Sequence, residues 1–124
     1  MTAKPILFVC ANDVATVTLN RPEKRNALNE AMWLGLAAAV RRADAATEAK
    51  IIVIRGAGGH FAAGADISEF ETVYATRERG MQYRRAVEDG ALAITDAAKP
   101  VIAMIEGSCI GGGMAIALAC DLRL

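Results

Sequence analysis

The sequence has little of what a metal centre, a charged interface or a membrane span requires. It contains a single histidine and three cysteines with no Cys-x-x-Cys pair, which argues against a zinc or iron site. Its 14 basic and 14 acidic side chains balance, so no overall field attracts nucleic acid or an anionic membrane. The longest uncharged stretch, residues 107–120, has fourteen residues and is shorter than the ~20 that a membrane-spanning helix needs. We therefore expect no metal, no nucleic-acid partner and no membrane partner.

Disulfide and targeting signals are also missing. Cys10, Cys109 and Cys120 are odd in number and lie in apolar runs, a pattern typical of buried, reduced thiols. Residues 1–5 precede only six apolar residues before Asn12, too few for a signal peptide. Both observations favour a cytoplasmic protein.

The apolar content is high instead. At 124 residues the chain is one domain at most, and 54% of it is hydrophobic, much of that alanine. Such a fraction is rich for a soluble domain of this size and predicts apolar faces that need a partner.

Glycine is concentrated in two loops. Residues 61–67 and 107–117, with their flanks, hold eight of the eleven glycines. Strand-like runs precede them, at 51–54 and 101–105, and helix-like segments follow. A strand, a glycine turn and a helix start direct free backbone N–H groups at one point and favour negative charge there. Two such points facing each other would form an oxyanion hole with two donors.

Strands and helices are expected to alternate along the chain. The first two strands, 6–10 and 14–19, should form a hairpin around Asn12 and Asp13. A helix capped by Asn29 should run to about Ala45, because Met32, Leu36, Val40 and Ala43 recur at helical spacing. The strand at 51–55 is apolar without alternation, as expected for a strand covered on both faces.

The rest of the chain continues this pattern. A helix marked by Tyr83, Val87, Ala91, Ile94 and Ala98 should stop before Pro100, followed by a strand at 101–105. The nearly all-apolar helix at 111–120 should be buried, and residues 121–124 begin another strand. Crossovers in this order build a parallel sheet with helices on both faces. Because the last strand would then lack neighbours, we expect the chain to be the front part of a longer protein.

Three motifs carry a resemblance to a known family. They are Asn20-Arg-Pro-Glu-Lys-Arg-Asn-Ala-Leu-Asn29, Phe61-Ala-Ala-Gly-Ala-Asp-Ile67 and Glu106-Gly-Ser-Cys-Ile-Gly-Gly-Gly113. In this order they resemble the enoyl-CoA hydratase/isomerase, or crotonase, family. The resemblance implies an α/β fold, a crotonase-like spiral of ββα units, of which residues 1–124 form the N-terminal part of a single domain. It also implies acyl-CoA thioester substrates, no separate cofactor, and a homotrimer or hexamer.

The same resemblance assigns roles to the two loops. The backbone N–H groups of Ala65 and Gly112 would hold the thioester oxygen, and the carbonyl of Ala63 would recognise the adenine of CoA. Lys24 and Arg25 are candidates for its phosphates, where charge-assisted contacts are natural. The implied binding set is completed by Ala27, Gly64, Asp66 and Ile67.

One position departs from the family pattern. Hydratases of this family carry a glutamate two residues after the triple glycine, where this chain has Ala115, and a second one beyond Leu124. An alanine transfers no proton, so hydration by two carboxylates is not supported. Three hypotheses stay open: an enzyme of the hydratase/isomerase type, including a Δ3,Δ2-enoyl-CoA isomerase with its base elsewhere; an acyl-CoA-binding protein without chemistry; and an interaction protein.

Other candidate side chains have plainer interpretations. Asp66 is expected to cap a helix, and Glu69 and Glu71 to lie on a solvated helix face. Turn and capping roles are expected for Glu106 and Asp121. His60 has no Ser or Cys constellation to orient it and is expected at a loop surface. The sequence lacks the Gly-x-Ser-x-Gly, Gly-x-Gly-x-x-Gly and Gly-Lys-Ser/Thr patterns.

Overall fold

A computed structural model describes residues 4–124. Residues 1–3, part of the segment judged too short for a targeting signal, lie outside the described residues. Strands and helices alternate along the described chain, as expected of an α/β fold.

The strands form one mixed sheet in the order β1-β2-β3-β4-β5. Strands β1 (Ile6–Ala11) and β2 (Val14–Leu19) make the predicted antiparallel hairpin. Its turn residues Asn12 and Asp13 have φ of 53° and 68°, the left-handed conformation that short hairpin turns favour. The other strands are parallel: β3 (Ile51–Gly56), β4 (Val101–Met104) and β5 (Leu122–Arg123).

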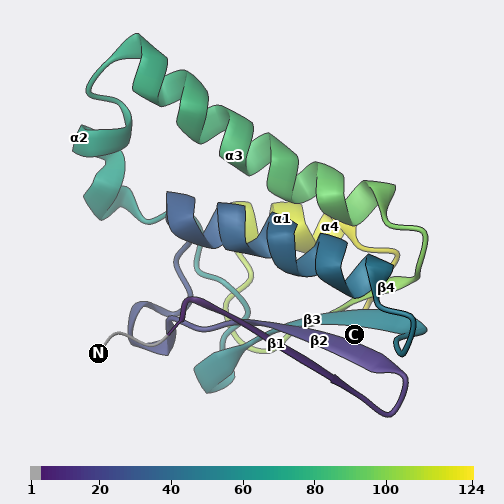
Figure 1. Ribbon diagram of the computed structural model, residues 1–124. Helices are drawn as coiled ribbons and strands as arrows, with labels where there is room; N and C mark the ends of the chain where they lie inside the picture. The colour runs from purple at the N-terminus through teal and green to yellow at the C-terminus, as the bar shows by residue number, and fades with distance from the viewer. Residues whose placement is uncertain (1–3) are drawn as a thin grey trace.

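All the long helices lie on one face of this sheet (Figure 1). They are α1 (Glu30–Ala45), α3 (Arg77–Asp96) and α4 (Gly112–Ala119), and each joins two neighbouring parallel strands. Every crossover advances one strand in the same direction. Because such crossovers share one hand, they bring each helix to the same side. The expectation of helices on both faces was therefore wrong for residues 4–124.

The helices form two layers over the sheet. Helix α1 packs on the strands, and α3 lies over α1 and α4 (Figure 1). The short elements lie in the connections: the 3₁₀ turns η1 (Pro22–Lys24), η2 (Ala57–Gly59) and η3 (Ile67–Glu69), and helix α2 (Phe70–Val73).

The core lies between the sheet and α1, as the helical spacing predicted. Met32, Leu36 and Val40 are fully buried against strand residues such as Val17 and Ile54. The Asn29 side chain accepts a hydrogen bond from the N–H of Met32 at 2.8 Å, which confirms the predicted cap.

Coverage of β3 and α4 differs from the sequence expectation. In β3, buried residues alternate with half-buried ones, because only one face of the sheet carries helices. In α4, Ile116 and Ala117 are buried, whereas Met114 and Leu118 are 47% and 64% exposed. The prediction that all of α4 is buried was wrong for the described residues.

Helix α3 ends four residues before Pro100, earlier than predicted. The carboxylate of Asp44 accepts hydrogen bonds from the N–H groups of Ala98 and Lys99. These bonds replace the bonds that a further helical turn would make, and they leave Ala98 exposed.

The three cysteines are free, but their burial is unequal. Cys120 is buried, and burial raises the pKa of its thiol to about 12. Cys10 and Cys109 are half-buried, so the expectation of full burial holds for Cys120 alone. Within residues 4–124, no helix is both long and apolar enough to cross a bilayer.

Candidate active site

Three loops meet beyond the carboxyl ends of β2, β3 and β4. They comprise residues 20–29, 57–66 and 105–111, and each connects a strand to the following helix. Because β2, β3 and β4 are parallel, these strand ends share one edge of the sheet. That edge is where open α/β sheets bind ligands.

Backbone hydrogen bonds join the first glycine loop to residues 24–28. The N–H of Ala63 donates to the carbonyl of Arg25 at 3.0 Å, and that of Leu28 to the carbonyl of Gly64 at 2.7 Å. The N–H of Asp66 returns a bond to the Leu28 carbonyl at 2.8 Å. These bonds place the segment that contains Lys24, Arg25 and Ala27 beside residues 63–67.

The second glycine loop pairs with the opposite side of the first. The N–H of Ala62 donates to the carbonyl of Ser108 at 3.0 Å, and the N–H of Ile110 donates to the carbonyl of Ala62 at 3.1 Å. A Cβ on Gly113 would lie 2.5 Å from the Ala62 oxygen, so the start of α4 can approach this closely only without a side chain. The two glycine loops are thus in direct contact.

The N–H of Ala65 faces away from Leu28. The Gly64 carbonyl points at Leu28, and a trans peptide bond directs the following N–H to the opposite side. Among residues 4–124, no backbone or side-chain acceptor pairs with the Ala65 N–H. It is a free donor beside the second loop.

The N–H of Gly112 is also unpaired within the described chain. Gly112 is the first residue of α4, where helix N–H groups have no partner in the helix and carry partial positive charge. A Cβ here would lie 2.9 Å from Leu28 Cδ1 and 3.1 Å from Trp33 Cζ2. Leu28 therefore touches both halves of the site: it is hydrogen-bonded to residues 64–66 and packed against Gly112.

Several exposed groups surround these two donors. Lys24 and Arg25 extend into solvent from the end of η1, and Ile67 is 75% exposed on the other side. The carbonyl of Ala63 accepts no hydrogen bond within residues 4–124. Positive charge, an open acceptor and an apolar side chain thus belong to two segments, 24–28 and 63–67, that backbone hydrogen bonds hold together.

Asp66 is held in a structural role, which confirms the capping interpretation. Its Oδ1 accepts hydrogen bonds from the Ser68 N–H at 3.0 Å and the Ser68 hydroxyl at 2.5 Å, and its Oδ2 pairs with Arg21 Nη1 at 3.1 Å. The Ser68 hydroxyl and the Arg21 guanidinium lower the pKa of this carboxyl below its usual value. A carboxylate held ionised in this way is an acceptor and a poor acid.

Of the remaining candidate carboxylates, two accept backbone hydrogen bonds and two are exposed to solvent. Asp121 accepts a hydrogen bond from the Val101 N–H at 2.8 Å, in line with its expected capping role. Glu71 is exposed as expected, and the exposed side chain of Glu106 makes no hydrogen bond within residues 4–124. Glu69 was expected on a solvated face, but it accepts a hydrogen bond from the Glu30 N–H at 2.7 Å and thereby caps α1. Ala115 is exposed on α4 and offers no proton.

Two polar residues at this site escaped the sequence interpretation. Asn26 is fully buried; its amide donates to the carbonyls of Ala57 and His60, and its Oδ1 accepts from the Arg21 N–H. His60 was expected at a loop surface, yet it is half-buried and its Nδ1 accepts from the Ser108 N–H at 2.9 Å. Their partners lie far along the chain, so no local pattern indicates them; the one usable signal is that asparagine tolerates the left-handed φ of 59° found at Asn26.

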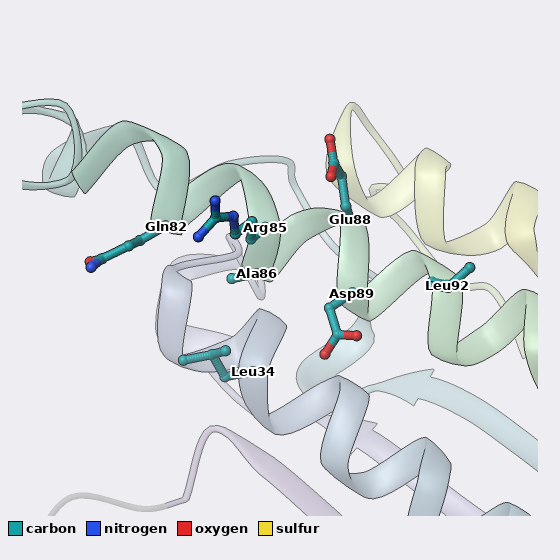
Figure 2. Close-up of a pocket in the computed structure, with 7 residues that line it drawn as sticks. All are labelled: Leu34, Gln82, Arg85, Ala86, Glu88, Asp89 and Leu92. Carbon is teal, nitrogen blue, oxygen red and sulfur yellow. The ribbon is translucent and has the colours of Figure 1, made fainter. Parts of the chain in front are cut away.

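A groove between α1 and α3 is one of several further concave surfaces on the described chain. Figure 2 shows Leu34 of α1 opposite Ala86 of α3, with Asp89 and Leu92 further along the same helix. It contains none of the loop residues described above. Within the part of the chain that the structure describes, no group of three potential metal ligands occurs.

Comparison with known proteins agrees with the geometry. The profile of the enoyl-CoA hydratase/isomerase family matches residues 10–124. A probable enoyl-CoA hydratase of Mycobacterium tuberculosis is 34% identical over 120 residues, which cover 97% of this chain and 46% of that protein. The mitochondrial Delta(3,5)-Delta(2,4)-dienoyl-CoA isomerase of Mus musculus is 33% identical over 123 residues, covering 89% of this chain and 36% of its own length.

Solved structures show the same relation. An enoyl-CoA hydratase/isomerase family protein of Hyphomonas neptunium superposes with a TM-score of 0.92 and 47% identity, covering 96% of this chain and 46% of its own. A crotonase of Legionella pneumophila gives a TM-score of 0.93 with 28% identity, over 99% and 48%. The crotonase-like fold is thereby confirmed, and the chain spans about half the length of the relatives it matches.

Proposed function

The chain belongs to the enoyl-CoA hydratase/isomerase family, and we propose that it supplies the oxyanion hole and much of the CoA site of an acyl-CoA enzyme. In this proposal the N–H groups of Ala65 and Gly112 bind the thioester oxygen. Both hydrogen bonds strengthen as negative charge develops on that oxygen in an enolate-like state, which is the condition for catalysis.

The observation that carries the proposal is the pair of unpaired donors. Gly112 is half-buried, and a half-buried backbone N–H is normally hydrogen-bonded, whereas Ala65 is exposed, so its N–H is open to a ligand. Two unpaired donors on adjoining loops are thus available to a single acceptor. The positive end of α4 at Gly112 adds a preference for negative charge. A thioester oxygen on its way to an oxyanion meets both requirements.

The CoA moiety is assigned to the rim beside these donors. The exposed side chains of Lys24 and Arg25 suit its phosphates, and the unpaired Ala63 carbonyl suits the adenine amino group. The backbone around Ala27, Gly64, Asp66 and Ile67 lines the path between them. The family resemblance further suggests assembly as a trimer or hexamer, and the free cysteines favour the cytoplasm as its compartment.

Ala115 bears on which reaction of the family the complete polypeptide performs, because it argues against hydration by two carboxylates. A hydratase of the two-carboxylate type needs a proton-transfer group where this chain has a methyl group. Isomerisation of a 3-enoyl-CoA to a 2-enoyl-CoA requires one base only, which a residue outside this sequence could supply. Isomerase chemistry is therefore the second candidate.

The test compares two substitutions at Gly112 in the complete polypeptide that carries this sequence. Gly112→Pro removes the N–H, and proline is favoured at the first position of a helix. Gly112→Ala adds the same Cβ, with the same contacts to Leu28 and Trp33, but keeps the N–H. Relative to the alanine variant, the proline variant should lose about 100-fold or more in kcat for 2-enoyl-CoA hydration or 3-enoyl-CoA isomerisation.

Each result has a distinct meaning. Equal turnover by the two variants would refute the role of the Gly112 N–H. Isomerisation without hydration would support the second candidate, whereas hydration at ordinary rates would contradict the weight placed on Ala115. Saturable acyl-CoA binding with no turnover would leave a binding protein, and a melting temperature unchanged by saturating acyl-CoA would leave an interaction protein.

A further inference from the structure

The imidazole of His60 provides a side-chain link between the two glycine loops. Its Nδ1 accepts the Ser108 N–H at 2.9 Å, across 48 residues of sequence. In this contact the Nδ1 atom is the acceptor and the backbone N–H of the second loop is the donor. The ring is thereby held against the second loop through its Nδ1 atom.

The surroundings of His60 leave it little freedom. Its carbonyl accepts the buried Asn26 amide at 2.8 Å, and its ring faces Gly107. A Cβ on Gly107, which has a φ of +56°, would lie 2.6 Å from the Nδ1 of His60 and 2.4 Å from the Gly59 carbonyl oxygen. The bare backbone of Gly107 therefore lies directly against the ring and the turn before it.

The link lies at the same point of both loops. His60 precedes Ala65 by five residues and Ser108 precedes Gly112 by four. After this point the loops share the Ala62–Cys109 backbone pairing and stay in contact as far as Gly64 and Gly111, where a Cβ on Gly111 would lie 3.7 Å from the Cα of Gly64. The two free N–H groups follow directly, at Ala65 and Gly112, so the approach of Ser108 to His60 is made at the base of the segment pair that carries both donors.

We propose that His60 is a positioning residue of the oxyanion hole, whose Nδ1 sets the spacing of the Ala65 and Gly112 N–H groups through Ser108. This inference rests on the proposed oxyanion role of those donors. The ring itself touches no substrate in this scheme. Because small misplacements of catalytic donors are costly, loss of the acceptor should lower kcat about tenfold while KM changes little.

The experiment uses three variants of the complete polypeptide. His60→Leu removes the acceptor. His60→Asn places a carbonyl oxygen at the δ position, which the accepting Nδ1 occupies in the parent protein. His60→Gln is the matched control, because it is polar and of similar length but carries its oxygen one atom further out. Melting temperatures identify any variant that fails to fold. If His60→Leu fails to fold, the comparison of His60→Asn with His60→Gln still tests the proposal.

The readout is the polarisation of a bound carbonyl, which requires no turnover. Butyryl-CoA labelled with carbon-13 at the thioester carbonyl has a C=O stretching frequency that falls when the oxygen accepts hydrogen bonds. We expect a clear downward shift on binding to the parent protein, a smaller one with His60→Leu and His60→Gln, and recovery with His60→Asn. Values of kcat should follow the same order as the frequency shifts, while KM should change little.

The failures are separable. No shift in the parent protein would refute the oxyanion hole itself. A normal shift in the parent with an equal shift in all three folded variants would refute the role of His60 alone. A reduced shift that His60→Asn does not recover would assign His60 to packing and would likewise overturn the proposal.

Discussion

The loop region and the pair α1 and α3 are held together by different forces. The loop region, made of residues 20–29, 57–66 and 105–111 with the start of α4 at Gly112 and Gly113, is joined by backbone hydrogen bonds and buried polar side chains. The two helices pack through small and apolar side chains, with the Arg41–Asp89 ion pair at the exposed edge. This difference indicates where the fold tolerates substitutions. Packed helices can accommodate a changed side chain by small shifts, whereas backbones in direct contact cannot.

The largest expected effect comes from adding one methyl group to the loop region. In Gly113→Ala the new Cβ would lie 2.5 Å from the backbone oxygen of Ala62, which already accepts the Ile110 N–H. Relief requires the two glycine loops to separate, so we expect a loss of about 3 kcal/mol in the free energy of unfolding, measured by urea denaturation.

Gly80→Ala is the matched control, since it also adds a methyl group to a helix. Its Cβ would lie 3.2 Å from the nearest atom of the Tyr74 ring and 3.9 Å from the Val73 carbonyl oxygen, the latter an ordinary van der Waals distance, and alanine improves helix propensity. The control should therefore be far less destabilising than Gly113→Ala. Similar losses in the two variants would contradict the idea that backbone contact makes the loop region intolerant.

The next effect concerns the buried amide of Asn26. Asn26→Ala leaves the carbonyls of Ala57 and His60 and the N–H of Arg21 without their side-chain partners. We expect a loss of about 2 kcal/mol in the free energy of unfolding, because unpaired buried polar groups are costly. Thermal unfolding followed by circular dichroism measures it.

Asn12→Ala separates the lost hydrogen bonds from the backbone effect. Asn12 has a φ of 53°, close to the 59° of Asn26, but it is exposed in the hairpin turn. Both alanines therefore bear the same left-handed strain. If the exposed variant loses as much stability as the buried one, the polar network contributes nothing measurable.

These two asparagines also show how far the sequence alone could go. Asn12 was predicted in its turn, and Asn29 at its cap, because each acts on its immediate neighbours in the chain. The strands, α1 and both glycine loops were likewise predictable from local periodicity and composition. The partners of Asn26 at Ala57 and His60 lie more than thirty residues away, so local pattern could not identify them.

The errors in coverage have a related cause. Apolar runs at β3 and α4 indicate potential burial but not which face is covered. That depends on the path of the crossovers, which place all three long helices on one side of the sheet (Figure 1). The contact between the two glycine loops was predicted from the sequence, while the side-chain contacts that accompany it, Arg21 with Asp66 and His60 with Ser108, could be seen only in three dimensions.

Acid should weaken the loop region through Asp66. The pKa of this carboxyl is lowered in the folded chain by Ser68 and Arg21, so its stabilisation is complete above the ordinary value of 3.8 and is lost as the pH falls through the lowered folded pKa. The stability difference between the parent and Asp66→Asn should accordingly shrink below about pH 4, which denaturation at several pH values would measure. A difference independent of pH down to complete acid unfolding would contradict this role of the ionised form.

The smallest effect is expected at the helix pair, from Arg41 and Asp89. These side chains make two hydrogen bonds, one of 2.8 Å between Nη1 and Oδ2, and the pair lowers the pKa of Asp89. Both are about half exposed, at 52% and 44%, so water and salt screen the attraction that the geometry suggests. Arg41→Gln and Asp89→Asn should therefore shift the melting temperature only slightly.

Salt sharpens the contrast between the two arginine–aspartate pairs. In 1 M salt the Debye length is about 3 Å, and the small effect of Arg41→Gln should disappear. The contribution of Arg21 and Asp66, whose side chains are only 17% and 12% exposed, should largely persist under the same conditions. Equal salt sensitivity of the two pairs would mean that burial does not distinguish them, and that the Arg21–Asp66 pair adds no more to the loop region than an exposed pair does.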